Sequence, residues 1–204
     1  MEAILKQTTR DFSKTSEKIQ TIIIALLAFL VPTFLAQLIK AIFGAQSMIT
    51  NNSQLIVGSV VNTVLVICAL NLKGWSKTAF VITMPSISTI LSGYVFKSAS
   101  VYMVWMIPAI WLGNFALILA FKYIMLAKEK SYVLAAISGV ICKVLIIFGF
   151  FTILKLFNVF PEKLVSNLQT AMSVTQLITA IIGCIIAYGI YKAESCDNKI
   201  KDVK

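Results

Sequence analysis

The sequence contains no histidine and few acidic residues, and both gaps limit its chemistry. Only eight of its 204 residues are Asp or Glu, and none of them lies within a long apolar run. Those runs therefore hold no acid–base pair and no carboxylate or imidazole for a proton relay. The GxSxG, HExxH and Walker phosphate-loop motifs are also missing. We expect no enzyme activity, no catalytic residue and no cofactor in this chain.

Cysteine is scarce and has no metal-binding or disulfide spacing. The sequence has four cysteines and no CxxC pair. Three of them, Cys68, Cys142 and Cys184, lie within apolar runs, where cysteine usually packs as a small hydrophobic residue. The pattern disfavours a disulfide framework, and without histidine it also disfavours a metal site.

Long apolar runs are what the sequence has in abundance. Hydrophobic residues make up 59% of the chain and charged residues only 13%. About 20 apolar residues in a helix cross the hydrocarbon core of a bilayer. This composition predicts an all-α integral membrane bundle of six transmembrane helices. We expect them at residues 19–43, 54–72, 78–96, 101–126, 132–157 and 166–191.

The distribution of Lys and Arg predicts the orientation. An even number of spans places both termini on one side, together with the second and fourth connections. With lysines near a helix end counted with the adjoining connection, this side holds four basic residues before the first helix, two and three in the two connections (the third being Lys122), and four in the tail. The other side holds four: Lys40, Lys97, Lys155 and Lys163. Basic residues concentrate on the cytoplasmic side. We therefore expect a cytoplasmic segment 1–18, a six-helix domain 19–191 and a charged cytoplasmic tail 192–204, and we attribute the net charge of +10 to this bias rather than to nucleic-acid binding.

Amide and hydroxyl side chains collect in the outer half of the expected bundle. An amide left unpaired in hydrocarbon costs roughly several kcal/mol, so these groups must meet each other, water or a ligand. Hydrogen bonds between helices are the alternative for any single residue. Their concentration on one side indicates an outward-facing binding cavity. The candidate binding residues on these helices are Gln54, Asn62, Trp111, Asn114, Gln169, Ser173 and Gln176.

Lys143 is the most unusual residue in the sequence. It lies about eleven residues into the fifth expected helix, and no membrane segment contains an Asp or Glu to pair with it. A charge at mid-membrane costs roughly 2.5–3.5 kcal/mol on insertion scales. The structural alternative is a snorkelling or neutral lysine that is satisfied by backbone oxygens. We add Lys143 to the candidate binding residues; if it binds the ligand, a carboxylate or other anionic group is the group expected opposite it.

Two helices carry a face of small residues. On the sixth helix, Ala180, Gly183 and Ala187 share one face and predict close packing with another helix. On the first helix, Thr21, Ala25 and Ala28 form a similar face. That second face can pack within the bundle or dock to a second membrane protein.

These features together resemble a known family. The sequence resembles the substrate-binding (S) component of energy-coupling factor (ECF) transporters, and looks most like bacterial members of unassigned substrate. The resemblance is carried by Lys143 and by the segments GSVVNTVLVICAL, MPSISTILSG, MIPAIWLGN and QLITAIIGCIIA. It implies a multi-pass protein of the bacterial cytoplasmic membrane that binds a transmembrane coupling subunit and two cytoplasmic ATPase subunits. It also implies that the first connection caps the pocket and that the first helix docks through an AxxxA-like face, whose nearest match is Thr21 with Ala25.

The expected function is therefore capture of a small organic micronutrient or vitamin for an ATP-driven importer. Two alternatives stay open from the sequence. One is a passive channel or facilitator for a small solute, and the other is a structural membrane subunit of a larger complex.

Overall fold

The computed structural model shows a bundle of helices. It describes residues 14–72, 74–93, 95–96 and 99–201, and within these ranges it contains no β-strand. Most of the expected segment 1–18 and the end of the expected tail 192–204 lie outside the described residues. The elements are α2 (Lys14–Phe43), α3 (Met48–Asn51), α4 (Ser53–Asn71), α5 (Trp75–Ser92), η2 (Tyr102–Met106), α6 (Ile107–Ala120), η3 (Phe121–Ala127), α7 (Tyr132–Leu156), α8 (Glu162–Met172) and α9 (Val174–Lys201).

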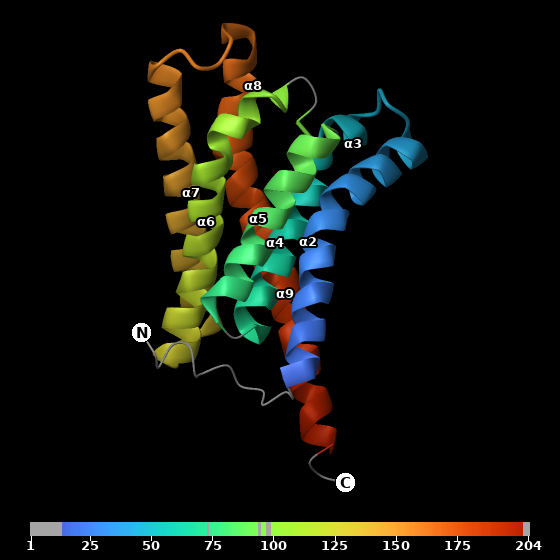
Figure 1. The fold of residues 1–204 in the computed structure, drawn as a ribbon, viewed down its shortest axis with the longest axis vertical. Coiled ribbons are helices and arrows are strands. Elements are labelled where there is room, and N and C mark those ends of the chain that lie inside the picture. Colours follow the sequence, from blue (N-terminus) through green and yellow to red (C-terminus); the bar gives the residue numbers. More distant parts are fainter. Residues whose placement is uncertain (1–13, 73, 94, 97–98, 202–204) are drawn as a thin grey trace.

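Successive long helices run in alternating directions (Figure 1). The start of α2 and the end of α9 lie at one end of the bundle, while α3 and α8 lie at the other. Two of the turns use glycine: Gly44 follows α2 with φ 81°, and Gly93 follows α5 with φ 66°. Their N–H groups bond to the carbonyls of Lys40 and Thr89 in the preceding helical turn. Glycine suits both positions because the left-handed region is strained for residues that carry a Cβ.

Five stretches of the structure are long and apolar enough to cross a membrane. The expected third span is not one of them, because α5 is rich in Ser and Thr and also contains Lys77 and Pro85. The all-α class is confirmed, while the crossing of the membrane by α5 stays a prediction. The five stretches are Lys18–Phe43, Ser53–Asn71, Tyr102–Ala127, Tyr132–Leu156 and Glu162–Ala193.

The outer surface of the bundle is apolar. On α7, the side chains of Ile137 and Leu145 are 53% and 64% exposed, and on α9 Ile185 is 65% exposed. Soluble proteins seldom present such continuous apolar surface. The interior, by contrast, contains buried amides and two buried lysines. This distribution is what a bilayer favours, since lipid solvates the apolar side chains and polar groups find partners inside.

The expected single helix at 101–126 is divided into three parts. It begins with the 3₁₀ turn η2, continues as α6 and ends as the π-helix η3. Pro108 stands in the first turn of α6 rather than inside a continuous helix. Proline lacks the N–H group that an interior position would use, and the first helical turn needs none.

The expected single helix at 166–191 is also divided. It consists of α8 and α9, which meet at Ser173, where φ is −116° and ψ is −89°. The Ser173 hydroxyl donates to the carbonyl of Gln169 at 2.6 Å. Serine side chains that bond to the carbonyl four residues earlier can bend a helix, and this bond lies at the break.

Helix α9 packs along α4, as its small-residue face predicts. Ala180 and Ala187 are fully buried, and Gly183 is buried as well. A Cβ on Gly183 would stand 2.9 Å from the Ser59 carbonyl oxygen. The prediction of close packing on this face is confirmed, because only a residue without a side chain fits there.

The small-residue face of α2 is used inside the bundle. Ala25 and Ala28 are buried in the same apolar cluster as Leu65 of α4 and Val81 of α5, and Thr21 is half-buried. The burial of both alanines is what packing within the bundle requires. The docking role of this face stays a prediction, and a partner would have to displace α4 or α5 to reach it.

Candidate functional site

Lys143 is buried in the bundle and is held by two amides. Its side chain is 2% exposed, and its Nζ donates to Asn114 Oδ1 at 2.7 Å and also to Asn62 Oδ1. The two asparagines are 3% and 2% exposed. Lys143 belongs to α7, Asn114 to α6 and Asn62 to α4. One buried amine therefore connects three helices, and three residues predicted as binding candidates are brought together.

Close contact between α6 and α7 places Asn114 beside Lys143. A Cβ on Gly113 would stand 3.2 Å from the Lys143 carbonyl oxygen and 2.8 Å from Ile147 Cγ1. One turn further, a Cβ on Gly139 of α7 would stand 3.0 Å from Leu117 Cδ1. The absence of side chains at these glycines lets the two backbones approach. The residue after Gly113 then lies within hydrogen-bond reach of the lysine.

The amide of Asn62 continues the polar contacts into α9. Its Nδ2 donates to the Gly58 carbonyl at 2.9 Å and to Thr179 Oγ1 at 3.3 Å. The Thr179 hydroxyl in turn donates to the Gln176 carbonyl at 3.2 Å. These bonds orient the Asn62 side chain so that its carbonyl oxygen is directed to Lys143 while its NH₂ group is occupied elsewhere.

A small cavity of about 70 Å³ adjoins this cluster. Its lining comes from α4 to α7, from the residues that follow α5, and from α9, and it includes Gln54, Asn114, Lys143 and Gln176 among the predicted residues. It also includes Ser86 of α5, which is 4% exposed. Over the described ranges, neither Ser86 Oγ nor Gln54 Nε2 has a hydrogen-bond partner, although both atoms are buried. Such atoms usually indicate water or a ligand, because an unpaired buried polar group is costly.

The remaining predicted residues lie outside this cavity. Gln169 is exposed on α8 and accepts a hydrogen bond from Lys155 Nζ at 3.3 Å. Ser173 stands at the break between α8 and α9 and is half-buried. Trp111 packs against the main apolar cluster, and its buried Nε1 has no partner among the described residues. A ligand role for these three stays a prediction, and none of them contacts Lys143 by a hydrogen bond in the part of the chain that the structure describes.

Two residues of the cluster were not predicted. Thr179 lies three positions after Gln176 and four before Gly183, so the helical spacing of that face includes it. Ser86 directly follows Pro85 in a span of mixed polarity, and no spacing rule distinguishes it from the neighbouring Ser and Thr residues of α5.

A second buried lysine, Lys122, has a different environment. The sequence places it near the inner end of its helix, where it counts toward the cytoplasmic lysines. The structure shows it 3% exposed in the π-helix η3, with Nζ donating to the Leu72 carbonyl at 2.6 Å. Leu72 is the C-terminal cap of α4. The lysine therefore satisfies a carbonyl at a helix end and complements the helix dipole, which is a structural role.

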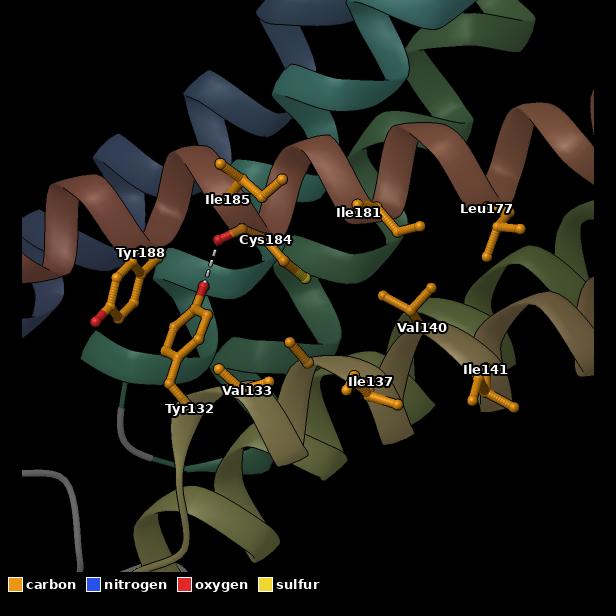
Figure 2. A pocket seen from close by; sticks show the side chains of 11 residues that line it. Tyr132, Val133, Ile137, Val140, Ile141, Leu177, Ile181, Cys184, Ile185 and Tyr188 are labelled. Atoms are coloured by element: carbon orange, nitrogen blue, oxygen red, sulfur yellow. Dashed lines mark hydrogen bonds between the residues drawn. The ribbon is translucent and has the colours of Figure 1, made fainter.

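Two larger hollows lie away from the cluster. One of about 340 Å³ lies where α2 connects to α4 and is bordered by polar residues, including Gln46, Thr50 and Ser53. The other, of about 460 Å³, is a groove between α7 and α9 (Figure 2). Figure 2 shows Tyr132 and Tyr188 at one end of this groove and isoleucines along its walls, and Tyr132 Oη donates to the Cys184 carbonyl at 2.7 Å. The groove has no amide or amine side chain in its lining, so it offers a polar ligand little to bind.

The chemistry available at the cluster is binding by hydrogen bonds and charge. The described residues contain no group of three His, Cys, Asp or Glu side chains that could hold a metal ion. The cavity instead presents a lysine amine, asparagine and glutamine amides and a serine hydroxyl. In its apolar surrounding, hydrogen bonds and charge interactions are stronger than in water.

Comparison of the chain with family models, with curated proteins and with solved structures finds no match.

Proposed function

We propose that the chain is the membrane-embedded substrate-binding subunit of an ATP-driven importer of the ECF type. It captures a small organic micronutrient or vitamin from the outer face of the bacterial cytoplasmic membrane. The observation that carries the proposal is the cavity beside Lys143. It combines a buried amine, the Asn114 amide and two polar atoms without a partner among the described residues, in the interior of a bundle whose outside is apolar.

Purely structural packing accounts less well for this interior. Polar groups that only join helices pair with each other, as Thr33 of α2 and Ser88 of α5 do through a 2.7 Å hydrogen bond. At the cavity, buried polar atoms of Ser86 and Gln54 stay without a partner among the described residues. Retaining such atoms destabilises a fold, so their presence is more readily explained by a molecule that binds to them.

The proposed topology has six spans, with α5 as the third and both termini in the cytoplasm. The alternating helix directions in Figure 1 support it, because the start of α2 and the end of α9 lie together. The larger basic content of the same end supports its cytoplasmic assignment. The hollow near the connection of α2 to α4 then opens on the outer side, where a ligand would arrive before it reaches the cavity.

The energy for import is proposed to come from partners. The sequence has no Walker motif and no membrane carboxylate for proton coupling. A transmembrane coupling subunit and two cytoplasmic ATPases would supply the driving force. Their contact with this chain is proposed to lie on α2, as the resemblance to S components implies.

The test is uptake into a bacterial host or into proteoliposomes with and without the coupling subunit and ATPases. We expect the small molecule that co-purifies with the chain to be taken up only when the partners and ATP are present. The variant Asn114→Leu should lose the bound molecule, whereas Gly149→Ala should keep it, since a Cβ at Gly149 meets nothing within 4 Å. Flux through the chain alone would overturn the proposal in favour of a passive channel. A chain that retains no molecule, with Asn114→Leu and Lys143→Gln both without effect, would favour a structural subunit.

A further inference from the structure

The cavity of about 70 Å³ beside Lys143, called the inner cavity below, also indicates the chemical class of the ligand. We infer that the cavity between Lys143, Ser86 and Gln54 receives the carboxylate of a small organic anion. This inference rests on the proposed function, since it names the substrate class of the same site.

The hydrogen-bond donors around the cavity match the needs of a carboxylate. A lysine ammonium has three N–H donors, and two of those of Lys143 are directed to Asn62 and Asn114. The Ser86 hydroxyl and the Gln54 NH₂ group are further donors, and both atoms lack a partner in the part of the chain that the structure describes. A carboxylate only accepts hydrogen bonds and offers about four acceptor positions. It can therefore satisfy the serine, the glutamine and the third lysine N–H together.

The charge of the site also favours an anion. The sequence has no Asp or Glu between Lys18 and Glu129, between Glu129 and Glu162, or between Glu162 and Glu194. The membrane helices therefore contain no residue that can neutralise Lys143. Asparagine oxygens solvate a cation but leave its charge in place, and an uncompensated charge in an apolar interior is strongly unfavourable. A bound carboxylate supplies the missing charge.

The volume limits which part of the ligand enters. A cavity of about 70 Å³ holds a few water molecules or one small charged group, since one water needs roughly 10–15 Å³. The body of a vitamin-sized molecule needs more space, and binding pockets for such molecules measure about 300–1,000 Å³. The outer hollow of about 340 Å³ has that size. Ser53 lines this hollow and the next residue, Gln54, lines the inner cavity, so both spaces border the start of α4.

The experiment measures binding of small probe molecules to the full-length chain purified alone, in lipid nanodiscs. Sodium acetate is titrated against acetamide, which has the same shape without the charge, and thermal unfolding is recorded at each concentration. We expect acetate to raise the unfolding temperature in a saturable manner and acetamide to leave it unchanged. Lys143→Gln should abolish the response to acetate. Lys163→Gln, which removes an exposed lysine of α8, should keep it, and this variant controls for the loss of one positive charge.

The variant Ser86→Ala provides a second test of the site in case Lys143→Gln fails to fold. Removing an unpartnered hydroxyl should not destabilise the chain, yet it should weaken acetate binding at least about tenfold, as expected for loss of one hydrogen bond to a charged group. Equal responses to acetate and acetamide, or an unchanged response in Ser86→Ala and Lys143→Gln, would overturn the inference.

These outcomes are separable from those of the uptake experiment. If an uncharged molecule is imported with ATP and acetate does not bind, the substrate class is wrong and the proposed function stands. If acetate binds through Lys143 and Ser86 but no coupling subunit associates, the anion site stands and the proposed function is wrong.

Discussion

Gly183 of α9 lies so close to Asn62 of α4 that a Cβ on the glycine would stand 2.5 Å from the Asn62 Cβ. The Gly183 carbonyl also accepts a hydrogen bond from Thr63 Oγ1 at 3.3 Å. Because Asn62 is one of the two amides that hold Lys143, the contact between these helices and the geometry of the cavity depend on one another. A change at Gly183 should therefore affect both stability and ligand binding.

The variant Gly183→Ala tests this dependence. The added methyl group meets Asn62 Cβ and, at 2.9 Å, the backbone of Ser59 and Thr63, so that α9 must move away from α4. Overpacking typically costs about 1–3 kcal/mol, which outweighs the roughly 1 kcal/mol that alanine gains over glycine in a helix. We expect a lower free energy of unfolding, measured by denaturant titration in detergent micelles.

The matched control is Gly189→Ala on the same helix. A Cβ at Gly189 meets nothing within 4 Å. This variant should be as stable as the natural chain, or more stable by up to about 1 kcal/mol from helix propensity alone. Equal effects of the two alanines would contradict the close contact at Gly183.

The variant Asn114→Asp should separate stability from binding. The new carboxylate has nearly the same shape as the amide and would stand beside Lys143 Nζ, where the amide oxygen is now 2.7 Å away. It would neutralise the lysine from within the chain, so acetate binding should fall at least about tenfold while the fold is kept. Asn114→Leu, in contrast, removes a partner of the buried amine and should cost about 1–3 kcal/mol. Full acetate affinity in Asn114→Asp would refute the charge argument.

The variant Lys122→Met tests the structural role of the second buried lysine. Methionine keeps much of the apolar stem but loses the hydrogen bond to the Leu72 carbonyl at 2.6 Å. Leaving that carbonyl unsatisfied should lower the free energy of unfolding by about 1–3 kcal/mol without changing ligand affinity. Lys128→Met is the control, because Lys128 is exposed and should change stability by less than about 0.5 kcal/mol. A loss of ligand binding in Lys122→Met would assign this lysine to the site instead.

Hydroxyl pairs between helices should contribute much less. Thr33 and Ser88 share a hydrogen bond of 2.7 Å between α2 and α5. Such bonds within membranes average about 0.6 kcal/mol in double-mutant cycles. We expect a coupling of this size between Thr33→Val and Ser88→Ala. Thr83→Val should show no coupling to Thr33→Val, because the Thr83 hydroxyl bonds only within its own helix among the described residues. A coupling above about 2 kcal/mol would show that the pair does more than join two helices.

The helices themselves could be read from the sequence with small errors at their ends. The expected ranges 54–72 and 132–157 correspond to Ser53–Asn71 and Tyr132–Leu156. The errors occur where one side chain competes with regular helix. Pro108 starts a new α-helix inside an apolar run, and the Ser173 hydroxyl bonds to the preceding turn at a break between two helices. Hydropathy does not register such local competition.

The candidate site was predictable in part. Lys143 and the two asparagines are conspicuous in apolar segments because each needs a partner there. Ser86 was missed because a serine in a membrane helix can satisfy itself on its own backbone, and sequence spacing does not tell which serine leaves its hydroxyl unpaired. The burial of Lys122 was not predicted either, since a lysine near a helix end normally extends to the membrane surface.

The sequence by itself determined the all-helical class and the apolar exterior, since both follow from hydropathy. It also determined that Lys143 must find partners, because the expected membrane spans contain no acidic residue. Only the tertiary structure decided which partners Lys143 finds. Asn62 and Asn114 are 81 and 29 residues away along the chain. Asn114 meets the lysine because Gly113 lets α6 approach α7, while Asn62 reaches it from α4, which packs against Gly183 of α9. Pairing across such distances depends on how side chains of different helices interlock, which no local pattern in the sequence specifies.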